Sequence, residues 1–364
     1  IIPFDAISDD AQSAQLANGL SELISADVSK FEDLFVLSLS ATRRYQGQEV
    51  EPRRINSELG ASYVIEGNLW RSDSALRVTA QLIDTQDARL VWSETYDGDL
   101  SADSIFSVLD KITDGVVGTV APQTGVIRQK EGSRMWSNRT DNLTAYECVA
   151  MYDYHGYNPG RTDRAEVREC LETAVQLDPD YVSAWAHLAG ILIEIYKNEA
   201  LPEGEAENLL DRAEAAAKRA VDLDNQSAEG YYRLAIISQL RGEGYPAFKA
   251  FADKAIALNP NEAGLLGDLE NFSYYSGDLE RGKELVARMM QLNPQYPSWA
   301  HFVFFLDHFR NDRFPEALSE VVKITLPNHC FIQWSKAAAY GKVGDTTNGR
   351  ATLEHIAAIE PPCG

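Results

Sequence analysis

The sequence is poor in basic residues. It has 33 lysines and arginines against 55 aspartates and glutamates, which gives a formal net charge of −22. A surface of this sign repels phosphate backbones, so we expect no direct nucleic-acid binding by this region. Cationic ligands, protons or basic protein surfaces are favoured instead. Solubility is the plainer explanation of the same charge.

Long apolar runs are also missing. No segment approaches the unbroken ~18 apolar residues of a membrane-spanning helix, so we expect membrane attachment only through an anchor that lies upstream of Ile1. The first residues, "IIPFDAISDD", lack the basic and apolar regions of a signal peptide. They resemble a strand whose first residues are missing, which predicts that the sequence has been trimmed from a longer parent protein.

The sequence has none of the motifs that hold phosphates, dinucleotides or a catalytic zinc ion: G-x-x-x-x-G-K, G-x-G-x-x-G or H-E-x-x-H. Its six histidines are scattered. His301 and His308 lie two helical turns apart and could share one helix face, but metal ligation would need further partners. We therefore predict no catalytic residue, metal or cofactor, and no enzyme activity in this region.

Residues 1–122 read as one small α/β domain. Helical spacing of apolar residues predicts helices over 16–28 and 105–120, with a third between Pro52 and Gly60. Period-2 alternation predicts strands between Val64 and Leu100, joined by the short turns that antiparallel neighbours need. "IIPF" and "LFVLSLS" (residues 34–40) are two further expected strands. The predicted order is β-α-β-α-β-β-β-α, an α/β sandwich.

A polar, punctuated stretch over 123–141 predicts a linker, and a repeat begins after it. Motifs of the "LDP" type recur at Leu177, Leu223, Leu258, Leu292 and Leu326, with "IEPP" at Ile359. The spacings are 46, 35, 34, 34 and 33 residues. A 34-residue period with proline after each second helix is the tetratricopeptide signature. Residues 142–364 are therefore predicted to form an all-α tetratricopeptide-repeat superhelix of five or six helix hairpins.

Aromatic residues crowd the first helices of the repeats, which line the concave groove where such superhelices usually bind peptides. Some of these positions belong to the repeat core. By phase, the groove candidates are Tyr232, Asn271, Tyr275 and Phe305, with His301 and His308 near them. The predicted partner is a protein or peptide, or a small ligand at the domain junction.

The first domain resembles the TolB-like amino-terminal domain of bacterial signalling proteins. The likeness rests on "PFDAISD", "NGLSELI", "YVIEGNLW", "AQLIDTQDARLVWSETYDGDL" and "IFSVLDKI", which occur in the family's order and spacing. The family often has Asp where this chain has Asn18, so any role of that carboxylate is absent.

The resemblance implies a function. TolB-like domains are commonly followed by tetratricopeptide repeats and usually sit beyond an effector, as in membrane-anchored adenylate cyclases and winged-helix, acid-sensor-like transcriptional regulators. This region would then be the non-enzymatic sensor of a receptor whose class III nucleotide cyclase or winged-helix effector lies upstream. A homodimer of this region is a further expectation. The alternative is a freestanding scaffold or adaptor that holds a peptide in its concave groove.

The four cysteines fall into two pairs by position. Cys148 and Cys170 each lie 11 residues from Pro159, the centre of the first hairpin's turn, so antiparallel helices would bring them within disulfide distance. Cys330 opens the first helix of the last hairpin and Cys363 follows its second. Buried free thiols are the alternative. Because disulfides persist in oxidising compartments, the pairs predict a periplasmic region, the soluble part of an inner-membrane protein.

Overall fold

The computed structural model describes residues 1–8, 10–72, 74–100, 104–122, 125–137, 143–157, 162–202, 204–293 and 296–359. The chain divides into two compact units, Ile1–Gly264 and Leu265–Gly364. Unit 1 contains the sheet and the first helix hairpins, and unit 2 contains the later ones. Among the described residues, no helix is both long enough and apolar enough to cross a bilayer.

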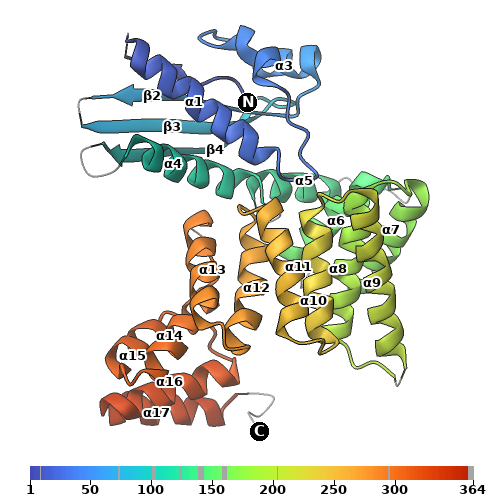
Figure 1. Cartoon of the computed structure of the whole chain (residues 1–364), viewed down its shortest axis with the longest axis vertical. Coiled ribbons are helices and arrows are strands. Elements are labelled where there is room, and N and C mark those ends of the chain that lie inside the picture. The colour runs from blue at the N-terminus through green and yellow to red at the C-terminus, as the bar shows by residue number, and fades with distance from the viewer. Residues whose placement is uncertain are drawn as a thin grey trace. The chain divides into compact units, whose positions relative to one another are not determined.

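Unit 1 begins with a four-stranded sheet (Figure 1). Its strands are β1 (Asp5–Ala6), β2 (Tyr63–Arg71), β3 (Ala75–Asp84) and β4 (Arg89–Asp99). They lie in the order β1-β2-β3-β4, with β1 parallel to β2 and the other pairs antiparallel. The three antiparallel strands predicted between Val64 and Leu100 are confirmed.

Side-chain alternation gives the sheet one apolar and one polar face. Leu69, Val78 and Leu82 are buried in a core shared with helices α1 (Ala11–Val28) and α4 (Ile105–Val120). On the opposite face, polar residues pair across the strands: Gln81 Nε2 donates to Glu66 Oε1 at 2.7 Å, and Arg77 Nε donates to Asp97 Oδ1 at 2.6 Å. The predicted half-buried alternation is therefore confirmed.

The strand predicted over 34–40 is wrong. Residues 34–38 have no regular secondary structure, and helix α2 (Leu39–Thr42) begins next. The reason lies in side chains that satisfy the backbone of the first residues. Phe4 N–H donates to Ser21 Oγ, Gln46 Nε2 donates to Phe4 O, and Thr42 Oγ1 donates to Ile1 O. A neighbouring strand would have to displace these bonds.

The short helices before β2 follow their sequence signals. The 3-10 turn η1 (Arg43–Tyr45) leads toward α3 (Pro52–Leu59). Helix α3 has proline at its first position and ends at Gly60, whose φ is 69°. Glycine adopts this left-handed conformation without steric cost, so both boundaries predicted from Pro52 and Gly60 are confirmed.

The predicted linker contains a helix, α5 (Val126–Ser137). The expectation of an irregular linker over 123–141 is therefore corrected, because most of this segment is helical. Its Ile127 is packed against the sheet core, and its Arg128 forms two buried ion pairs. These contacts stabilise a helix in a segment whose polar composition suggested a loop. The proposed domain boundaries at 122 and 141 stay predictions.

Within the described residues, six antiparallel helix pairs follow, in agreement with the five or six that the repeat predicts. The pairs are α6 (Ala145–Tyr157) with α7 (Arg164–Leu177), α8 (Val182–Asn198) with α9 (Glu205–Leu223), α10 (Ala228–Leu240) with α11 (Tyr245–Leu258), α12 (Ala263–Tyr275) with α13 (Leu279–Leu292), α14 (His301–Arg310, after the 3-10 turn η2 at Ser298–Ala300) with α15 (Phe314–Val321), and α16 (Cys330–Val343) with α17 (Thr346–Ala357).

The helix ends agree with the repeat period. Helices α7, α9, α11 and α13 end at Leu177, Leu223, Leu258 and Leu292, the leucines of the recurring motif. The 46-residue step is accounted for by the long helices α8 and α9, of 17 and 19 residues. The α/β sheet part and the tetratricopeptide-type hairpins are thus both present.

Candidate functional site

A cavity of about 680 Å³ lies in unit 1. It is bordered by the irregular segment 34–37, the start of β2, and residues of α3, α5 and α6. Its apolar lining includes Leu34, Val36, Ile55, Val64 and Ile127. Its polar lining is Asp33, Thr42, Ser62, Tyr63, Gln86, Glu131 and Tyr146. A mostly apolar cavity with a few convergent polar groups is the usual form of a small-molecule site.

Glu131 and Tyr63 meet on the polar wall. The Tyr63 hydroxyl donates to Glu131 Oε1, and Arg134 NH1 donates to the same oxygen at 3.1 Å. Burial, followed by the hydrogen bond to the nearby Glu131 carboxylate, raises the pKa of Tyr63, so the phenol stays protonated. This arrangement fixes the side chain of Glu131 at the cavity.

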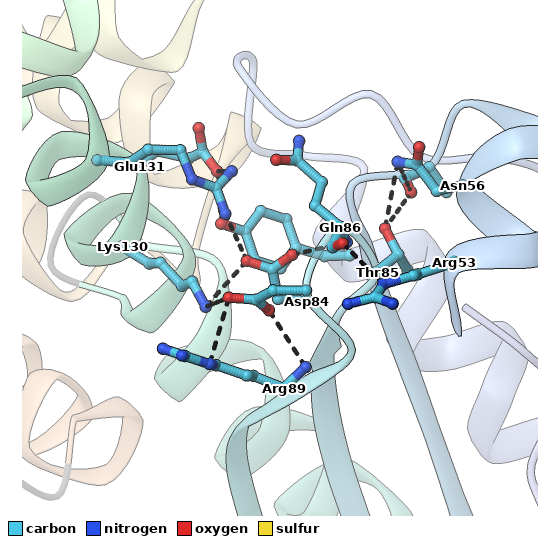
Figure 2. Close-up of polar contacts among 12 residues, drawn as sticks. Arg53, Asn56, Asp84, Thr85, Gln86, Arg89, Lys130 and Glu131 are labelled. Carbon is cyan, nitrogen blue, oxygen red and sulfur yellow. Dashed lines mark hydrogen bonds and ion pairs between the residues drawn. The ribbon is translucent and has the colours of Figure 1, made fainter. Parts of the chain in front are cut away.

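Behind this wall, Asp84 ends β3 and is fully buried. Figure 2 shows Lys130 reaching it from α5, with Gln86 and Thr85 following on the chain. Lys130 Nζ lies 2.9 Å and Arg134 NH2 2.5 Å from Asp84 Oδ2, and Gln86 N–H donates to Oδ1 at 2.9 Å. Burial alone would raise the pKa of Asp84, but these donors and cations hold it below its usual value.

A second charged cluster surrounds Arg128 on α5. Arg128 NH2 lies 2.8 Å from Asp33 Oδ2 and its NH1 lies 3.0 Å from Asp153 Oδ2. His187 Nε2 is 3.3 Å from the other oxygen of Asp153. Burial opposes ionisation of Asp33, but the Arg128 charge keeps the pKa of this carboxyl below its usual range. Asp33 lines the cavity, so the cluster joins the cavity to helices α6 and α8.

Polar contacts continue toward the third hairpin. Arg233 NH2 on α10 donates to the Tyr152 hydroxyl at 3.1 Å, and that hydroxyl donates to Glu194 Oε1 at 3.2 Å. From the segment after α1, Glu32 accepts from the Ser227 hydroxyl at 3.1 Å and from Glu229 N–H at 3.3 Å, at the start of α10. The sheet part and the first three hairpins are therefore connected by polar bonds, some buried and some exposed.

The repeat helices of unit 1 also form a shallow depression of about 460 Å³. Trp185, Leu188 and Leu192 of α8 form its floor, and Arg212 and Arg219 of α9 lie beside them. The two arginines pair with Glu172 and Asp180. An open apolar depression of this kind could accept apolar side chains of a peptide.

Two of the six predicted groove residues are buried. Tyr232 and Phe305 are 6% and 3% exposed, which leaves little of either ring for a partner. The side chains of Asn271 and Tyr275 lie outside the described part of the chain. His301 Nδ1 is 2.7 Å from Glu320 Oε2, while His308 is half-buried on the same helix. A binding role for these six residues stays a prediction.

Sequence reasoning missed Asp33, Arg128, Glu131 and Asp153. The spacing of Ile127, Arg128, Glu131 and Arg134 fits one helix face and could have indicated the two α5 residues, but no such signal points to Asp33 or Asp153. No group of three or more potential metal ligands occurs among the described residues.

The predicted pairing of Cys148 with Cys170 is confirmed. The two residues form a disulfide with a Cα–Cα distance of 5.3 Å, joining α6 to α7. The second predicted pairing cannot be followed in the same way, because Cys363 lies outside the described residues. The helix-hairpin argument therefore succeeds at the first pair.

No protein-family model matches the chain. A curated protein of Rhizobium meliloti (strain 1021), "Putative adenylate cyclase 3", is 29% identical over 236 residues. The match covers 65% of this chain and 39% of that protein. The chain therefore spans well under half the length of the relative.

Solved structures with some likeness include YrrB, described as a TPR protein with an unusual peptide-binding site. It is 19% identical, with coverage of 53% of this chain and 94% of that chain and a TM-score of 0.40. PilW, a type IV pilus biogenesis factor, is 16% identical, with coverage of 60% and 94% and a TM-score of 0.47. With TM-scores this low, the repeat assignment rests on the chain's own helix pairs and period.

Proposed function

We propose that this chain is the non-enzymatic sensory and interaction region of a bacterial signalling receptor. A small ligand in the cavity, or a protein on the repeat helices, would change the packing of the sheet part against the first hairpins. The observation that carries this proposal is the Arg128 cluster, because Asp33 lines the cavity and pairs with Arg128 of α5, which in turn pairs with Asp153 of α6. A ligand that moves Asp33 would disturb contacts outside the cavity.

The partial match to an adenylate cyclase supports the receptor context. The matched region is 39% of that relative, so room for other domains exists outside it. We assign to this chain's parent an upstream effector, either a class III nucleotide cyclase or a winged-helix DNA-binding domain. The TolB-like likeness of the first 122 residues, and assembly as a homodimer, belong to the same proposal.

Location in the periplasm is the second part of the proposal. It is supported by the Cys148–Cys170 disulfide, since such bonds persist in oxidising compartments. The test is thiol labelling of the parent protein in intact cells with a membrane-impermeant maleimide, before and after reduction. Labelling of this pair only after reduction is expected. Free thiols at both positions in freshly lysed cells would contradict the periplasmic assignment.

A freestanding peptide-binding adaptor is the second candidate. The depression floored by Trp185 and flanked by Arg212 and Arg219 favours it, because peptide binding there needs no effector. Reading the parent's complete coding sequence separates the two candidates. An effector domain followed by about 20 apolar residues supports the receptor; their absence would leave the adaptor.

A further inference from the structure

We propose that the unit 1 cavity binds an apolar molecule carrying one cationic head group, such as a primary alkylammonium. This deepens the proposed ligand-sensing function by naming the ligand class, and its site is the cavity beside β2. The inference rests on three features: the apolar lining, the available oxygen of Glu131, and the sign of the charges in the polar wall.

The lining defines the body of the ligand. A volume of about 680 Å³ lies within the range of roughly 300–1,000 Å³ typical of small-molecule sites. Leu34, Val36 and Ile55 present only apolar side-chain atoms to it. Phe35, from the same irregular segment, also belongs to the lining, and its side chain is 94% exposed in total. An alkyl chain or ring would remove this apolar surface from water.

Glu131 defines the head group. Tyr63 and Arg134 both donate to its Oε1, whereas Oε2 has no hydrogen bond to any residue in the described part of the chain. The Glu131 side chain is 18% exposed, so this oxygen is not sealed in the core. A carboxylate that is held in place through one oxygen can accept a donor from a ligand through the other.

The charge of the surrounding wall selects a cation. The cavity lining holds two carboxylates, Asp33 and Glu131, and, among the described residues, no lysine or arginine. The cations directly behind it are Arg128, Lys130 and Arg134. The cations are already committed, since Arg128 bridges two carboxylates and Lys130 and Arg134 share Asp84. An anionic head group would find no free cation among these residues and would face Asp33 and Glu131. A cation would complete the pairing.

The test is calorimetric titration of the full chain at pH 7 with three probes of equal chain length: octylammonium, octanol and octanoate. The shared tail isolates the contribution of the head group. We expect octylammonium to bind best and octanoate worst, with the difference shrinking as salt is added. Equal affinity for octylammonium and octanoate would overturn the assignment of a cationic ligand.

The variant Glu131→Gln keeps the side-chain shape and an acceptor for Tyr63 but removes the charge. We expect it to weaken octylammonium binding about tenfold, equivalent to about 1.4 kcal/mol, and to leave octanol binding unchanged. Glu22→Gln, which changes an exposed carboxylate on α1, is the matched control and should bind octylammonium like the unsubstituted chain. If Glu131→Gln binds octylammonium as well as Glu22→Gln does, the head-group site is refuted.

A cavity-filling variant tests whether the probes bind in this cavity. Val36→Trp enlarges a lining side chain in the irregular segment, and it should abolish binding of both octylammonium and octanol while the protein keeps its melting transition. Undiminished binding by this variant places the probe elsewhere and rejects the cavity. The receptor proposal is judged separately by the parent's coding sequence, so either idea can fail without the other.

Discussion

Asp84 is a fully buried carboxylate whose partners come from a helix 46 or more positions later in the chain. Replacing it by asparagine keeps the size but leaves Lys130 and Arg134 without their shared anion. Both cations are about a quarter exposed, so water offsets part of the loss. We expect Asp84→Asn to lower the free energy of unfolding by about 2 kcal/mol.

Urea unfolding followed by circular dichroism measures this change. The control is Asp97→Asn, which breaks an ion pair with Arg77 in which both side chains are more than half exposed. Exposed pairs of this kind contribute little, so the control should unfold close to the unsubstituted chain. Equal destabilisation by the two substitutions would contradict the role given to Asp84.

Gly67 lies where β2 closely approaches both β3 and Phe4. A Cβ atom there would lie 2.2 Å from Thr79 O and 2.3 Å from Phe4 Cε1. Because one of these atoms is backbone, we expect Gly67→Ala to destabilise the sheet by about 2 kcal/mol or more. Gly19→Ala in α1, where a Cβ would meet nothing within 4 Å, should instead stabilise by up to about 1 kcal/mol. Thermal melts of the two variants should therefore shift in opposite directions.

Helix α8 contributes a titrating group to the Arg128 cluster. Burial alone would lower the pKa of His187, but the hydrogen bond and charge of Asp153, with further help from Asp33 and Glu229, raise it above its usual value. The imidazolium is thus favoured in the folded state. The associated stability is fully present below the unfolded pKa of about 6.5 and is lost as pH rises through the folded pKa.

We expect the melting temperature of the unsubstituted chain to fall between pH 6 and pH 8 by about 2 °C more than that of His187→Gln. Differential scanning calorimetry at both pH values measures the effect. His329→Gln, an exposed histidine that precedes α16, should keep the full pH dependence. A His187→Gln protein with the same pH dependence as His329→Gln would show that His187 does not titrate as argued.

The elements that could be predicted from sequence are those with a local or periodic signal. Pro52 and Gly60 mark both ends of α3, and the recurring leucines mark the ends of four second helices. The strand prediction for residues 34–38 was wrong because it used only the local preference of these residues. The backbone of the first residues, with which such a strand would have paired, is instead satisfied by the side chains of Gln46, Thr42 and Ser21.

The cavity wall lay beyond sequence reasoning for a related cause. Asp33 and Arg128 are 95 positions apart, and no spacing rule joins two charges at that distance. Tyr232 shows a different limit of helix phase. Its phase on α10 predicted a groove position, and the structure adds that the Arg233 guanidinium lies 4.6 Å from its ring centroid and that the residue is buried. Helix phase alone does not say which neighbours cover a face.

For the whole chain, the α5 contacts predict where fragments can be cut. Arg128, Lys130 and Arg134 bind carboxylates of the sheet part, so a fragment 1–122 loses these partners, whereas a fragment 1–262 keeps them together with the first three hairpins. We expect 1–262 to unfold cooperatively and 1–122 to melt at a clearly lower temperature. Circular dichroism of the purified fragments measures this; equal melting temperatures would support a boundary at residue 122 instead.

The Cys148–Cys170 bond also has a mechanical consequence. A chain stretched from its two ends can lengthen by up to about 3.5 Å for each residue it unravels, but the 22 residues spanned by this bond cannot contribute. With this bond intact, pulling on the unravelled chain should therefore yield a total extension shorter by roughly 70 Å than in a variant that lacks this bond alone. The helix pair nearest the sheet part, α6 with α7, would then transmit tension through a covalent bond between its two helices.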